Sequence, residues 1–522
     1  MFNSKVFSES KPKLFLLLLA LTVLMRIDTL ALSDVELDES VYFLMAKSMV
    51  QGHAPYSAIW DHKPPGIYAI FYGAFMLFGV STFSMRLVAC LAVALSALLS
   101  SQIYQRLRPS RAQAPEGEPG SDGWYKLLPA LLVVVLFRKS GGEGSNTEVF
   151  FTPVVALAVL SLLIGIDEAS PLGRRRLALL GAGAAAGAAF WIKLNTIVEI
   201  GFAGAAAVLW LAGPMRARIK RIAEETVLTA LGFVLFSLLA ILPFVLTDHL
   251  SLLSTSVIDA NIRHAGQRMG AQETFRYVML IFESSILLWT LGLCGLLLRL
   301  RTAFDARVDR AFWFVVVWLS GAFISAMAPG QPYLHYALET VVPLSVLATL
   351  CFEELFLSYL PRSRVLLAAA AFLVLGSAGT QPLLVGMNVG RELSDYARHR
   401  SLHNVDTSRA VGDYIQEHAS SSPPTLFVLD GHPIIYHTSG VVPPTKYAFP
   451  PFLLDPHFEH VTGIDGKTEI ARIVAEKPEF IVRRTDPLPV SVETLTEVNA
   501  GLATRYHLDR QIHNVEILKR NE

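Results

Sequence analysis

The chain has 522 residues, of which 52% are hydrophobic and only 17% are charged. Soluble globular proteins carry about 25% charged residues, so this composition predicts a membrane protein and excludes a disordered, collagen-like or small disulfide-rich chain. Lys and Arg together number 44, as do Asp and Glu. The zero net charge argues against a nucleic-acid-binding surface.

The chain contains about eleven apolar runs close to the roughly 20 residues that a helix needs to cross a bilayer. They lie at 14–32, 84–105, 126–138, 148–166, 177–193, 196–213, 226–247, 276–298, 311–328, 336–357 and 365–384. Basic residues concentrate in alternate loops, for example at 174–176 and 216–221. The positive-inside rule then predicts a polytopic helical protein with a cytoplasmic N-terminus and an outer C-terminus.

After residue 384 the composition becomes that of a soluble protein. DTSRAVGDYIQEHA, which begins with the capping residue Asp406, predicts a helix, and so does KTEIARIVAEK. TLFVLD and EFIVRR predict buried strands on either side of the second helix. We therefore expect a transmembrane domain over 1–384 and a small extracytoplasmic α/β domain over 385–522.

The first outer loop begins with an acidic cluster that includes Asp38 and Glu39. Tyr42, Ala46 and Met49 follow at helical spacing, which predicts an amphipathic helix on the membrane surface with Asp38 at its start. Acidic residues at a membrane edge are often merely solvated, and that alternative stays open for this cluster.

The same loop continues with the sequence WDHKPPG at 60–66, before a second apolar helix expected at 67–79. The two prolines fix the chain direction and hold Lys63 near the lipid–water boundary. A lone interfacial lysine usually anchors a helix by reaching into water. A lysine beside an acidic cluster and a Pro-Pro-Gly turn is better interpreted as an anion binder.

These motifs together resemble the GT-C membrane glycosyltransferases, in particular the bacterial branch related to protein O-mannosyltransferases and aminoarabinose transferase. The resemblance rests on four motifs in the order found in that family. They are Asp-Glu-x-x-Tyr-x-x-x-Ala at 38–46 with Gly52 and Tyr56, Lys-Pro-Pro-Gly at 63–66, Gly-Ser-Asn-Thr-Glu at 144–148, and His335-Tyr336 ahead of an apolar span with Pro343.

The resemblance implies the GT-C fold and an inverting sugar transfer on the outer face of the membrane. The donor would be a polyprenyl-phosphate sugar, and the acceptor a glycolipid, polysaccharide or protein of the cell envelope. Membrane lipids would be the other partners, and no nucleic acid is expected. The chain has no Asn-x-Ser/Thr sequon and is rich in Ala, Leu and Arg, which favours a bacterial inner membrane.

The resemblance also assigns residues to the reaction. Asp38 matches the catalytic position and is expected to be the general base for the acceptor hydroxyl. Its neighbour Glu39 is a second candidate. Glu148 matches the second acidic position, where it would orient the acceptor or hold a divalent metal. The alternative for Glu148 is a helix N-terminal charge favoured by the helix dipole.

The leaving lipid phosphate needs cations placed for its developing charge. Lys63 is the first candidate, and Lys193, flanked by apolar sequence, is the second. His335 and Tyr336 are expected to donate hydrogen bonds to the phosphate or sugar. Two alternatives stay open. Lys193 would instead be a lysine that reaches to the interface, and His335 and Tyr336 would belong to an interfacial aromatic belt.

Acceptor or lipid contacts are expected from Tyr42, Tyr56 and Arg263, with ordinary surface charge as the alternative for Arg263. A divalent cation is left open, with Asp38, Glu148 and His62 as weak candidate ligands.

Two departures separate this chain from aminoarabinose transferase. That enzyme has an arginine three residues after its catalytic aspartate, where this chain has Val41. It also has an acidic residue before the lysine of its Lys-Pro motif, where this chain has His62. Both departures put the aminoarabinose donor, the lipid A acceptor and any copied metal site in doubt.

Two other functions fit a polytopic chain. A transporter or lipid flippase would suit many spans and a buried charge such as Lys193. A scaffold whose outer domain binds a partner is the third possibility. The acidic residues gather at one outer edge, whereas transport sites lie near the middle of the membrane, which favours the transferase.

Overall fold

The computed structural model describes residues 11–108, 124–210, 215–264, 270–302, 310–354, 363–487 and 492–521. Contacts between α-carbons divide the chain into two compact units. The first unit contains Met1–Ile27, Leu87–Leu242 and Arg268–Val385, and the second contains Asp28–Arg86, Pro243–Gln267 and Gly386–Glu522. Two stretches of the N-terminal two-thirds of the chain therefore belong to the same unit as the C-terminal residues.

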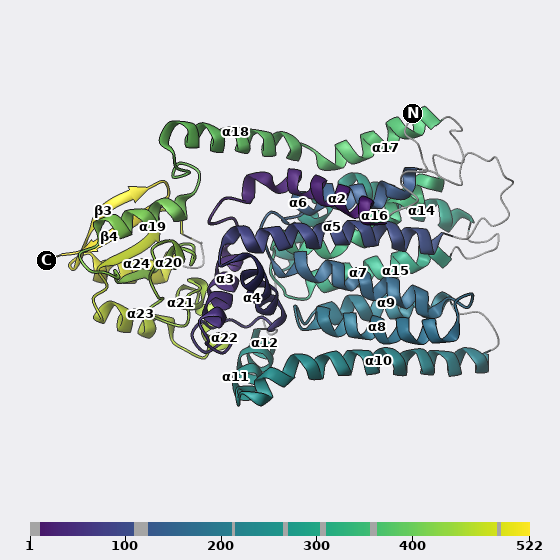
Figure 1. The fold of residues 1–522 in the computed structure, drawn as a ribbon, viewed down its shortest axis with the longest axis horizontal. Helices are drawn as coiled ribbons and strands as arrows, with labels where there is room; N and C mark the ends of the chain where they lie inside the picture. The colour runs from purple at the N-terminus through teal and green to yellow at the C-terminus, as the bar shows by residue number, and fades with distance from the viewer. Residues whose placement is uncertain are drawn as a thin grey trace. The chain divides into compact units, whose positions relative to one another are not determined.

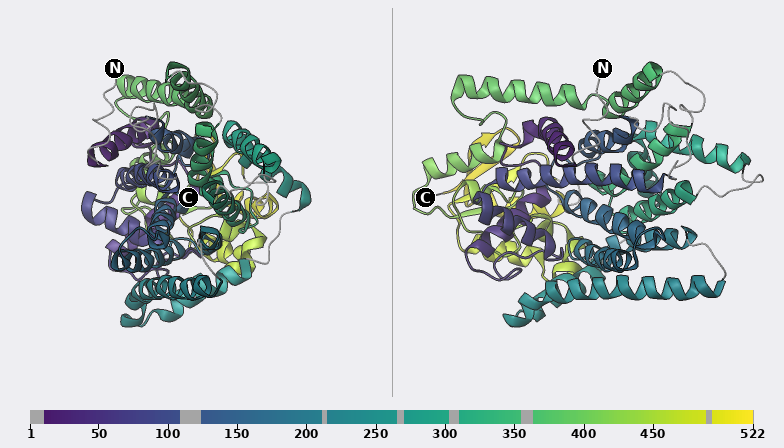
Figure 2. Two further views of the ribbon diagram at one scale, coloured as in Figure 1. Left: turned by 90° about the vertical axis from the view of Figure 1, so that its right-hand side faces the viewer. Right: turned by 45° about the vertical axis from the view of Figure 1, so that its right-hand side comes forward.

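The first unit is a bundle of helices that run side by side, as Figures 1 and 2 show from three directions. Its helices are α2 (Lys11–Arg26), α5 (Thr82–Leu107), α6 (Leu128–Lys139), α7 (Thr147–Ile166), α8 (Leu172–Phe190), α9 (Thr196–Trp210), α10 (Met215–Leu246), α13 (Ala271–Ser284), α14 (Ile286–Thr302), α15 (Arg310–Met327), α16 (Leu338–Phe352) and α17 (Ser363–Ala378). Helix α7 packs against α8 and α9, and α15 packs against α9 and α16.

Helix α7 illustrates why these sequences form spanning helices. Beyond its first six residues it is apolar except for Ser161, and most of its 20 residues are buried. At about 1.5 Å per residue the helix is about 30 Å long, which matches the hydrocarbon core of a bilayer. A helix that is apolar all round is stable only when lipid or other helices surround it.

Five of the described helices are long and apolar enough to cross a membrane, and the number rises to seven if each of two bent pairs counts as one span. The bent pairs are α13 with α14, at 92°, and α17 with α18 (Gln381–His399), at 54°. The chain is thus an α-helical membrane protein, but the expected count of about eleven spans is not confirmed. Four expected spans correspond to helices that do not meet this test of length and composition, namely α2, α6, α8 and α9.

Helices α8 and α10 approach each other through glycine. A Cβ atom on Gly183 would lie 1.8 Å from the Thr229 carbonyl oxygen, and one on Gly232 would lie 2.1 Å from the Leu180 carbonyl oxygen. Glycine at both positions lets the two backbones touch, which is how helices in lipid gain packing energy without a hydrophobic driving force.

The second unit contains two helices from the segment between α2 and α5, α3 (Leu37–Val50) and α4 (Gly66–Phe78), which pack together. Helix α3 is present where the spacing predicted it, with Asp38 in its first turn. The prediction that it is amphipathic is wrong, because every residue from Glu39 to Ala46 is buried. Tyr42 and Phe43 pack edge-on against Phe71 and Phe75 of α4.

The start of α3 is fixed by Arg86, at the beginning of α5. The Arg86 guanidinium is fully buried, forms an ion pair with Glu39 and donates to the carbonyl oxygens of Thr29 and Leu32. The Val35 N–H donates to the same Glu39 oxygen over 3.2 Å. These bonds tie the segment that precedes α3 to the helix itself.

The C-terminal part of this unit is the expected α/β structure around a four-stranded sheet. The strands are β1 (Leu426–Val428), β2 (Phe480–Arg484), β3 (Tyr506–Ile512) and β4 (Val515–Arg520), in the order β1-β2-β4-β3. Strands β1 and β2 are parallel, β4 is antiparallel to β2, and β3 and β4 form an antiparallel pair (Figure 1).

Both helices expected in this part are present. They are α19 (Thr407–His418), whose Asp406 cap accepts from the Arg409 N–H over 3.1 Å, and α23 (Gly466–Ala475). The unit also contains the longer helix α24 (Val492–Leu502) and several short helices. The short ones are α11 (Leu250–Leu253), α12 (Ala260–His264), α20 (Ile435–Thr438), α21 (Pro451–Leu454) and α22 (Glu459–Thr462).

We predict that Gly183→Ala lowers the stability of the protein, because the added methyl group must push α8 and α10 apart. The expected loss is about 1–3 kcal/mol, the usual cost of an overpacked contact. Thermal unfolding in detergent measures it, with Gly181→Ala as the matched control, since a Cβ there meets nothing within 4 Å. Equal loss in both variants would show that the helix contact is not the cause.

We also predict that Glu39→Gln destabilises the protein strongly, whereas Asp38→Asn does not. Removing one partner of a buried ion pair leaves the other charge uncompensated, at a cost of about 3–5 kcal/mol. Thermal unfolding of both variants provides the comparison. A Glu39→Gln protein as stable as the wild type would contradict the structural role of this pair.

Candidate active site

Asp38 and Glu39 are neighbours in the first turn of α3, but their environments differ. Glu39 is held by Arg86. Asp38 is partly exposed, and its Oδ2 accepts a hydrogen bond from the Tyr42 hydroxyl over 3.3 Å. Within the described part of the chain no hydrogen bond reaches Asp38 Oδ1. Of the two predicted catalytic carboxylates, Asp38 is the one that can receive a further proton donor.

The Asp61-His62-Lys63 segment forms a second polar group in the same unit. Asp61 Oδ1 accepts from the His62 backbone N–H over 2.7 Å, and Asp61 Oδ2 accepts from the Tyr68 hydroxyl over 2.8 Å. Lys63 Nζ lies 3.4 Å from His62 Nε2. Lys63 is partly exposed, while Asp61 and His62 are buried.

The titration of this group follows from its burial and its charges. Burial and the nearby charge of Lys63 lower the pKa of His62, so the imidazole is neutral at neutral pH. Burial alone would raise the pKa of Asp61, but the hydrogen bond from His62 and the positive charge of Lys63 hold it below its ordinary value. The segment therefore has no net charge: it presents one partly exposed ammonium group, Lys63, and one buried carboxylate, Asp61.

Tyr56 fixes the backbone at Lys63. Its hydroxyl donates to the Lys63 carbonyl oxygen over 2.9 Å, and its ring packs edge-on against Tyr68 at 5.7 Å between centroids. Tyr56 itself has φ 69°, a left-handed conformation that is strained for a large side chain and persists only where the surroundings enforce it. Tyr42 and Tyr56 are both fully buried, which suits residues that position Asp38 and Lys63.

Arg263 lies in α12, within the second unit. The residue is exposed, and its Nη2 donates to the Val461 carbonyl oxygen over 3.1 Å. The guanidinium is thus partly used to hold α12 to α22, and the remaining donors face solvent.

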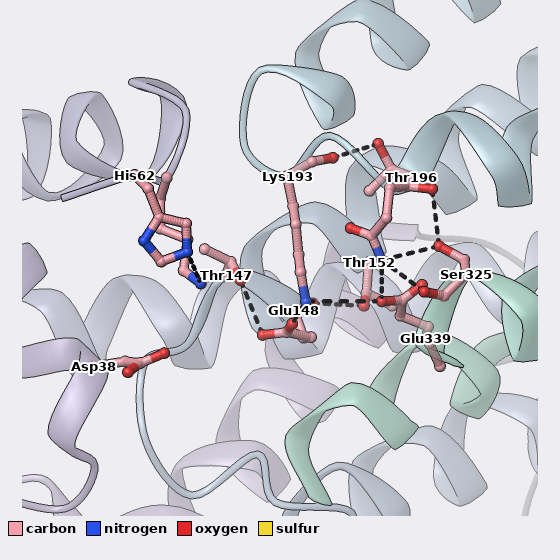
Figure 3. Close-up of polar contacts among 12 residues, drawn as sticks. Asp38, His62, Thr147, Glu148, Thr152, Lys193, Thr196, Ser325 and Glu339 are labelled. Atoms are coloured by element: carbon pink, nitrogen blue, oxygen red, sulfur yellow. Dashed lines mark hydrogen bonds and ion pairs between the residues drawn. The ribbon is translucent and has the colours of Figure 1, made fainter. Parts of the chain in front are cut away.

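Glu148 and Lys193 form the centre of a polar group in the first unit. Glu148 lies in the first turn of α7 and is buried, and Lys193 lies in the turn between α8 and α9. The two side chains form an ion pair, and Glu148 Oε2 also accepts from the Thr147 hydroxyl over 3.0 Å. Lys193 Nζ sits 3.7 Å above the centre of the Tyr336 ring. Figure 3 shows Lys193 reaching down to Glu148.

Glu339 completes this group, and sequence reasoning missed it. Its Oε1 lies 4.0 Å from Lys193 Nζ and accepts from Asn195 Nδ2 over 2.9 Å (Figure 3). Asn195 also donates to the Ser325 hydroxyl over 3.1 Å. Glu339 Oε2 is buried and has no hydrogen-bond partner among the described residues. The available signal was its position, one helical turn after His335 at the start of an apolar span.

His335 and Tyr336 lie in the short turn η4 (Leu334–Ala337) that leads into α16. Both are buried, and the His335 ring stacks on Tyr333 at 5.6 Å. The loop before α7 approaches this turn so closely that a Cβ on Gly141, where φ is +81°, would lie 2.8 Å from the His335 backbone nitrogen. The structure thus brings Glu148, Lys193, His335 and Tyr336 into one unit.

Arg26, which sequence reasoning did not single out, holds the same loop. At the end of α2, its buried guanidinium donates to the carbonyl oxygens of Gly142, Glu143 and Gly144. Three consecutive backbone groups ahead of Glu148 are thereby fixed by one side chain.

The candidate metal ligands do not form a metal cluster. Among the described residues there is no group of three or more His, Cys, Asp or Glu side chains that could hold a metal ion. Asp38 is bonded to Tyr42, Glu148 is paired with Lys193, and His62 Nδ1 lies 3.2 Å from Asp61. The residues present do not fit a metal site.

Comparisons with known proteins place the fold. No protein-family model matches the chain, and no curated protein matches its sequence. Among solved structures it is similar to ArnT from Cupriavidus metallidurans in the apo state, with a TM-score of 0.62 and 16% identity over 96% of this chain and 97% of that one. The same protein bound to undecaprenyl phosphate gives a TM-score of 0.59 and 14% identity over 98% of both chains.

An oligosaccharyltransferase from Archaeoglobus fulgidus, in complex with Zn and sulfate, is similar with a TM-score of 0.55 and 13% identity. That match covers 90% of this chain and 68% of the archaeal one. At such low identities the likeness concerns the fold. This chain therefore has the GT-C fold of membrane glycosyltransferases.

Proposed function

We propose that this protein is an inverting glycosyltransferase of the cell envelope. It moves a sugar from a polyprenyl-phosphate donor to an extracytoplasmic acceptor, which is a glycolipid, a polysaccharide or a protein. The observation that carries the proposal is the open carboxylate of Asp38 on a GT-C fold. The binding of undecaprenyl phosphate by the similar ArnT supports the choice of donor.

Asp38 is the general base in this proposal. As the acceptor hydroxyl attacks the anomeric carbon, its proton passes to the free Oδ1 of Asp38. The bond between that carbon and the phosphate oxygen breaks on the opposite face, and the lipid phosphate leaves with the bonding electrons. One displacement of this kind inverts the anomeric centre. Glu39 is excluded from the base role because Arg86 already occupies its carboxylate.

Lys63 is the cation for the leaving phosphate. Its ammonium group lies beside the neutral His62 ring and not beside a carboxylate, so it is available to an anion. Lys193 is less suited to this role, since it is neutralised by Glu148 and lies near Glu339. A preplaced positive charge at the leaving oxygen stabilises the transition state more than the ground state.

The group around Glu148 is assigned to sugar hydroxyls. Two carboxylates, one ammonium and one amide meet there, and one carboxylate oxygen of Glu339 has no protein partner. His335 and Tyr336 form one wall and supply further polar atoms beside Lys193. Sites built to hydrogen-bond hydroxyl groups discriminate strongly against ligands that lack them.

The remaining assignments complete the proposal. Tyr42 and Tyr56 position Asp38 and Lys63, and Arg263 is reserved for the acceptor or for lipid headgroups. Residues 1–384 form the catalytic membrane domain, and residues 385–522 form an outer domain. The N-terminus is cytoplasmic and the C-terminal domain is periplasmic, supported by the distribution of basic residues. No step is assigned to a metal ion.

We expect Asp38→Asn to lower the transfer rate by about 10²-fold or more, the usual contribution of a general base. Purified protein in nanodiscs is given a panel of polyprenyl-phosphate sugars with an envelope glycan extract, and released polyprenyl phosphate is measured by mass spectrometry. Glu469→Gln, on α23 and outside the assigned residues, serves as the control and should keep the wild-type rate. A parallel reaction with EDTA tests metal dependence.

A wild-type protein that binds none of the donors would contradict the proposed function. An Asp38→Asn protein that transfers at the wild-type rate would contradict the assigned base.

Lys63→Met and Lys193→Met are expected to fail in different ways. Loss of Lys63 should weaken donor binding about 10- to 100-fold, because a charge-assisted hydrogen bond is removed. Loss of Lys193 should lower the melting temperature, because Glu148 is left buried without its partner. Donor titration and thermal unfolding separate the two. The double variant Glu148→Gln/Lys193→Met should recover part of the lost stability, and if it does not, the ion pair is not the cause.

A further inference from the structure

A cavity of about 210 Å³ lies in the second unit, and none of the residues that line it is assigned to transfer. It is formed by the segment that follows η1 (Ile27–Thr29), the first turn of α19, and the ends of β2 and β4. Its polar lining includes Asp34, Ser408, His432, Arg484 and Asn514. Val35, Ile435 and Val515 give it an apolar wall. We refer to this cavity as the Arg484 pocket.

The polar side chains of the Arg484 pocket are positioned by the protein but not fully used by it. Arg484 donates through Nε and Nη2 to Asp430 Oδ1, over 3.2 and 3.1 Å, while Nη1 has no partner among the described residues. His432 Nδ1 and Asp430 Oδ2 are buried atoms that likewise lack one. Asp430 is 3% exposed, so water does not readily replace the missing bond. Buried polar atoms without partners mark places where a ligand gains more than it would at the surface.

The charges of the Arg484 pocket determine which ligands it suits. Asp34 lines it and accepts a hydrogen bond from the Ser408 hydroxyl, and Asp430 lies directly behind Arg484. The pocket and its surroundings thus contain two carboxylates for one guanidinium, which disfavours an anion such as phosphate. The same set offers donors from Arg484 and acceptors from Asp34, His432 and Asn514. Mixed donors and acceptors at fixed positions, next to an apolar wall, match a neutral ligand with several hydroxyl groups.

The size of the Arg484 pocket narrows the ligand further. Its volume is that of about seven water molecules at about 30 Å³ each, and it lies below the range of about 300–1,000 Å³ for drug-sized ligands. One sugar ring fits such a volume, whereas an oligosaccharide or a lipid chain does not.

We propose that the Arg484 pocket binds a single neutral sugar residue, either as a free sugar or as one unit of a glycan chain. This binding uses none of the transfer residues, so it stands or fails independently of the transferase activity.

Saturation-transfer NMR on the full-length protein in nanodiscs tests the proposal with the methyl glycosides of the common aldohexoses and aldopentoses. At least one glycoside should bind, with a Kd of about 1 mM, as befits a small ligand. His432→Phe fills the pocket and Asn514→Ala removes one acceptor, and each should weaken binding by about fivefold or more. His507→Phe, an exposed histidine on β3 outside the pocket, is the matched control and should bind as the wild type does.

Further measurements identify the source of the sugar and keep the experiment interpretable if one variant fails to fold. If an oligosaccharide that ends in the bound sugar competes with the glycoside, the pocket binds a unit of a glycan chain. If it does not compete, the pocket binds a free sugar. Asn514 is exposed, so Asn514→Ala keeps the test valid if His432→Phe fails to fold. Asp38→Asn should bind the glycosides normally.

Three results would overturn the proposal. These are no binding by any glycoside of the panel, unchanged binding in both pocket variants, or displacement of the bound glycoside by inorganic phosphate.

Discussion

The structure of the second unit depends on one buried guanidinium, that of Arg86. A fully buried positive charge is tolerated only when an opposite charge and further hydrogen-bond acceptors surround it. Here two backbone carbonyls and the carboxylate of Glu39 do so. Glu39 cannot turn away without leaving the charge unpaired, so the rotation of α3 about its axis is fixed. Successive residues of a helix are about 100° apart, and Asp38 is therefore directed to a different side. The direction of the Asp38 carboxylate therefore depends on the fixed position of Glu39.

The first unit balances its buried charges in another way. Two carboxylates, Glu148 and Glu339, share a single ammonium group, and Asn195 supplies the additional donor. In an apolar bundle such a group is stable only if all three side chains stay in place. The close approach of Gly141 to His335 and the three carbonyls bound by Arg26 serve that purpose, since they fix the loop from which α7 begins. A glycine and a set of backbone hydrogen bonds thus keep Glu148 in position beside Lys193 and Glu339.

Much of this arrangement could be predicted from the sequence, because the signals are local. The Asp406 cap, the strands β1 and β2, the helix α23 and the helix that starts beside Asp38 all follow from residues within a few positions of one another. The antiparallel pair β3–β4 was missed because its outer strand is mostly exposed and lacks an apolar pattern.

The partners of charged residues could not be predicted, since they are far apart in the chain. Arg86 and Glu39 are 47 positions apart, and Glu148 and Lys193 are 45 apart. Nothing in the local sequence indicates that Glu39 forms an ion pair while Asp38 keeps one carboxylate oxygen without a hydrogen bond. The apolar run at 276–298 predicts one span, and its bend could not be predicted because the turn at Ser285 carries no proline or glycine that would reveal it.

That turn has a consequence for how the protein meets its solvent. A bend of 92° interrupts the ladder of backbone bonds between α13 and α14, and hydrocarbon offers no replacement for the bonds that are lost. The Ser284 hydroxyl donates to the Ile281 carbonyl oxygen and the Ser285 N–H donates to that of Phe282, so some of the lost bonds are replaced within the turn itself. Ser284 and Ser285 are both buried, so protein groups have to supply most of the bonds that remain. At the corner between these two helices the bundle, and not the lipid, must therefore satisfy the backbone.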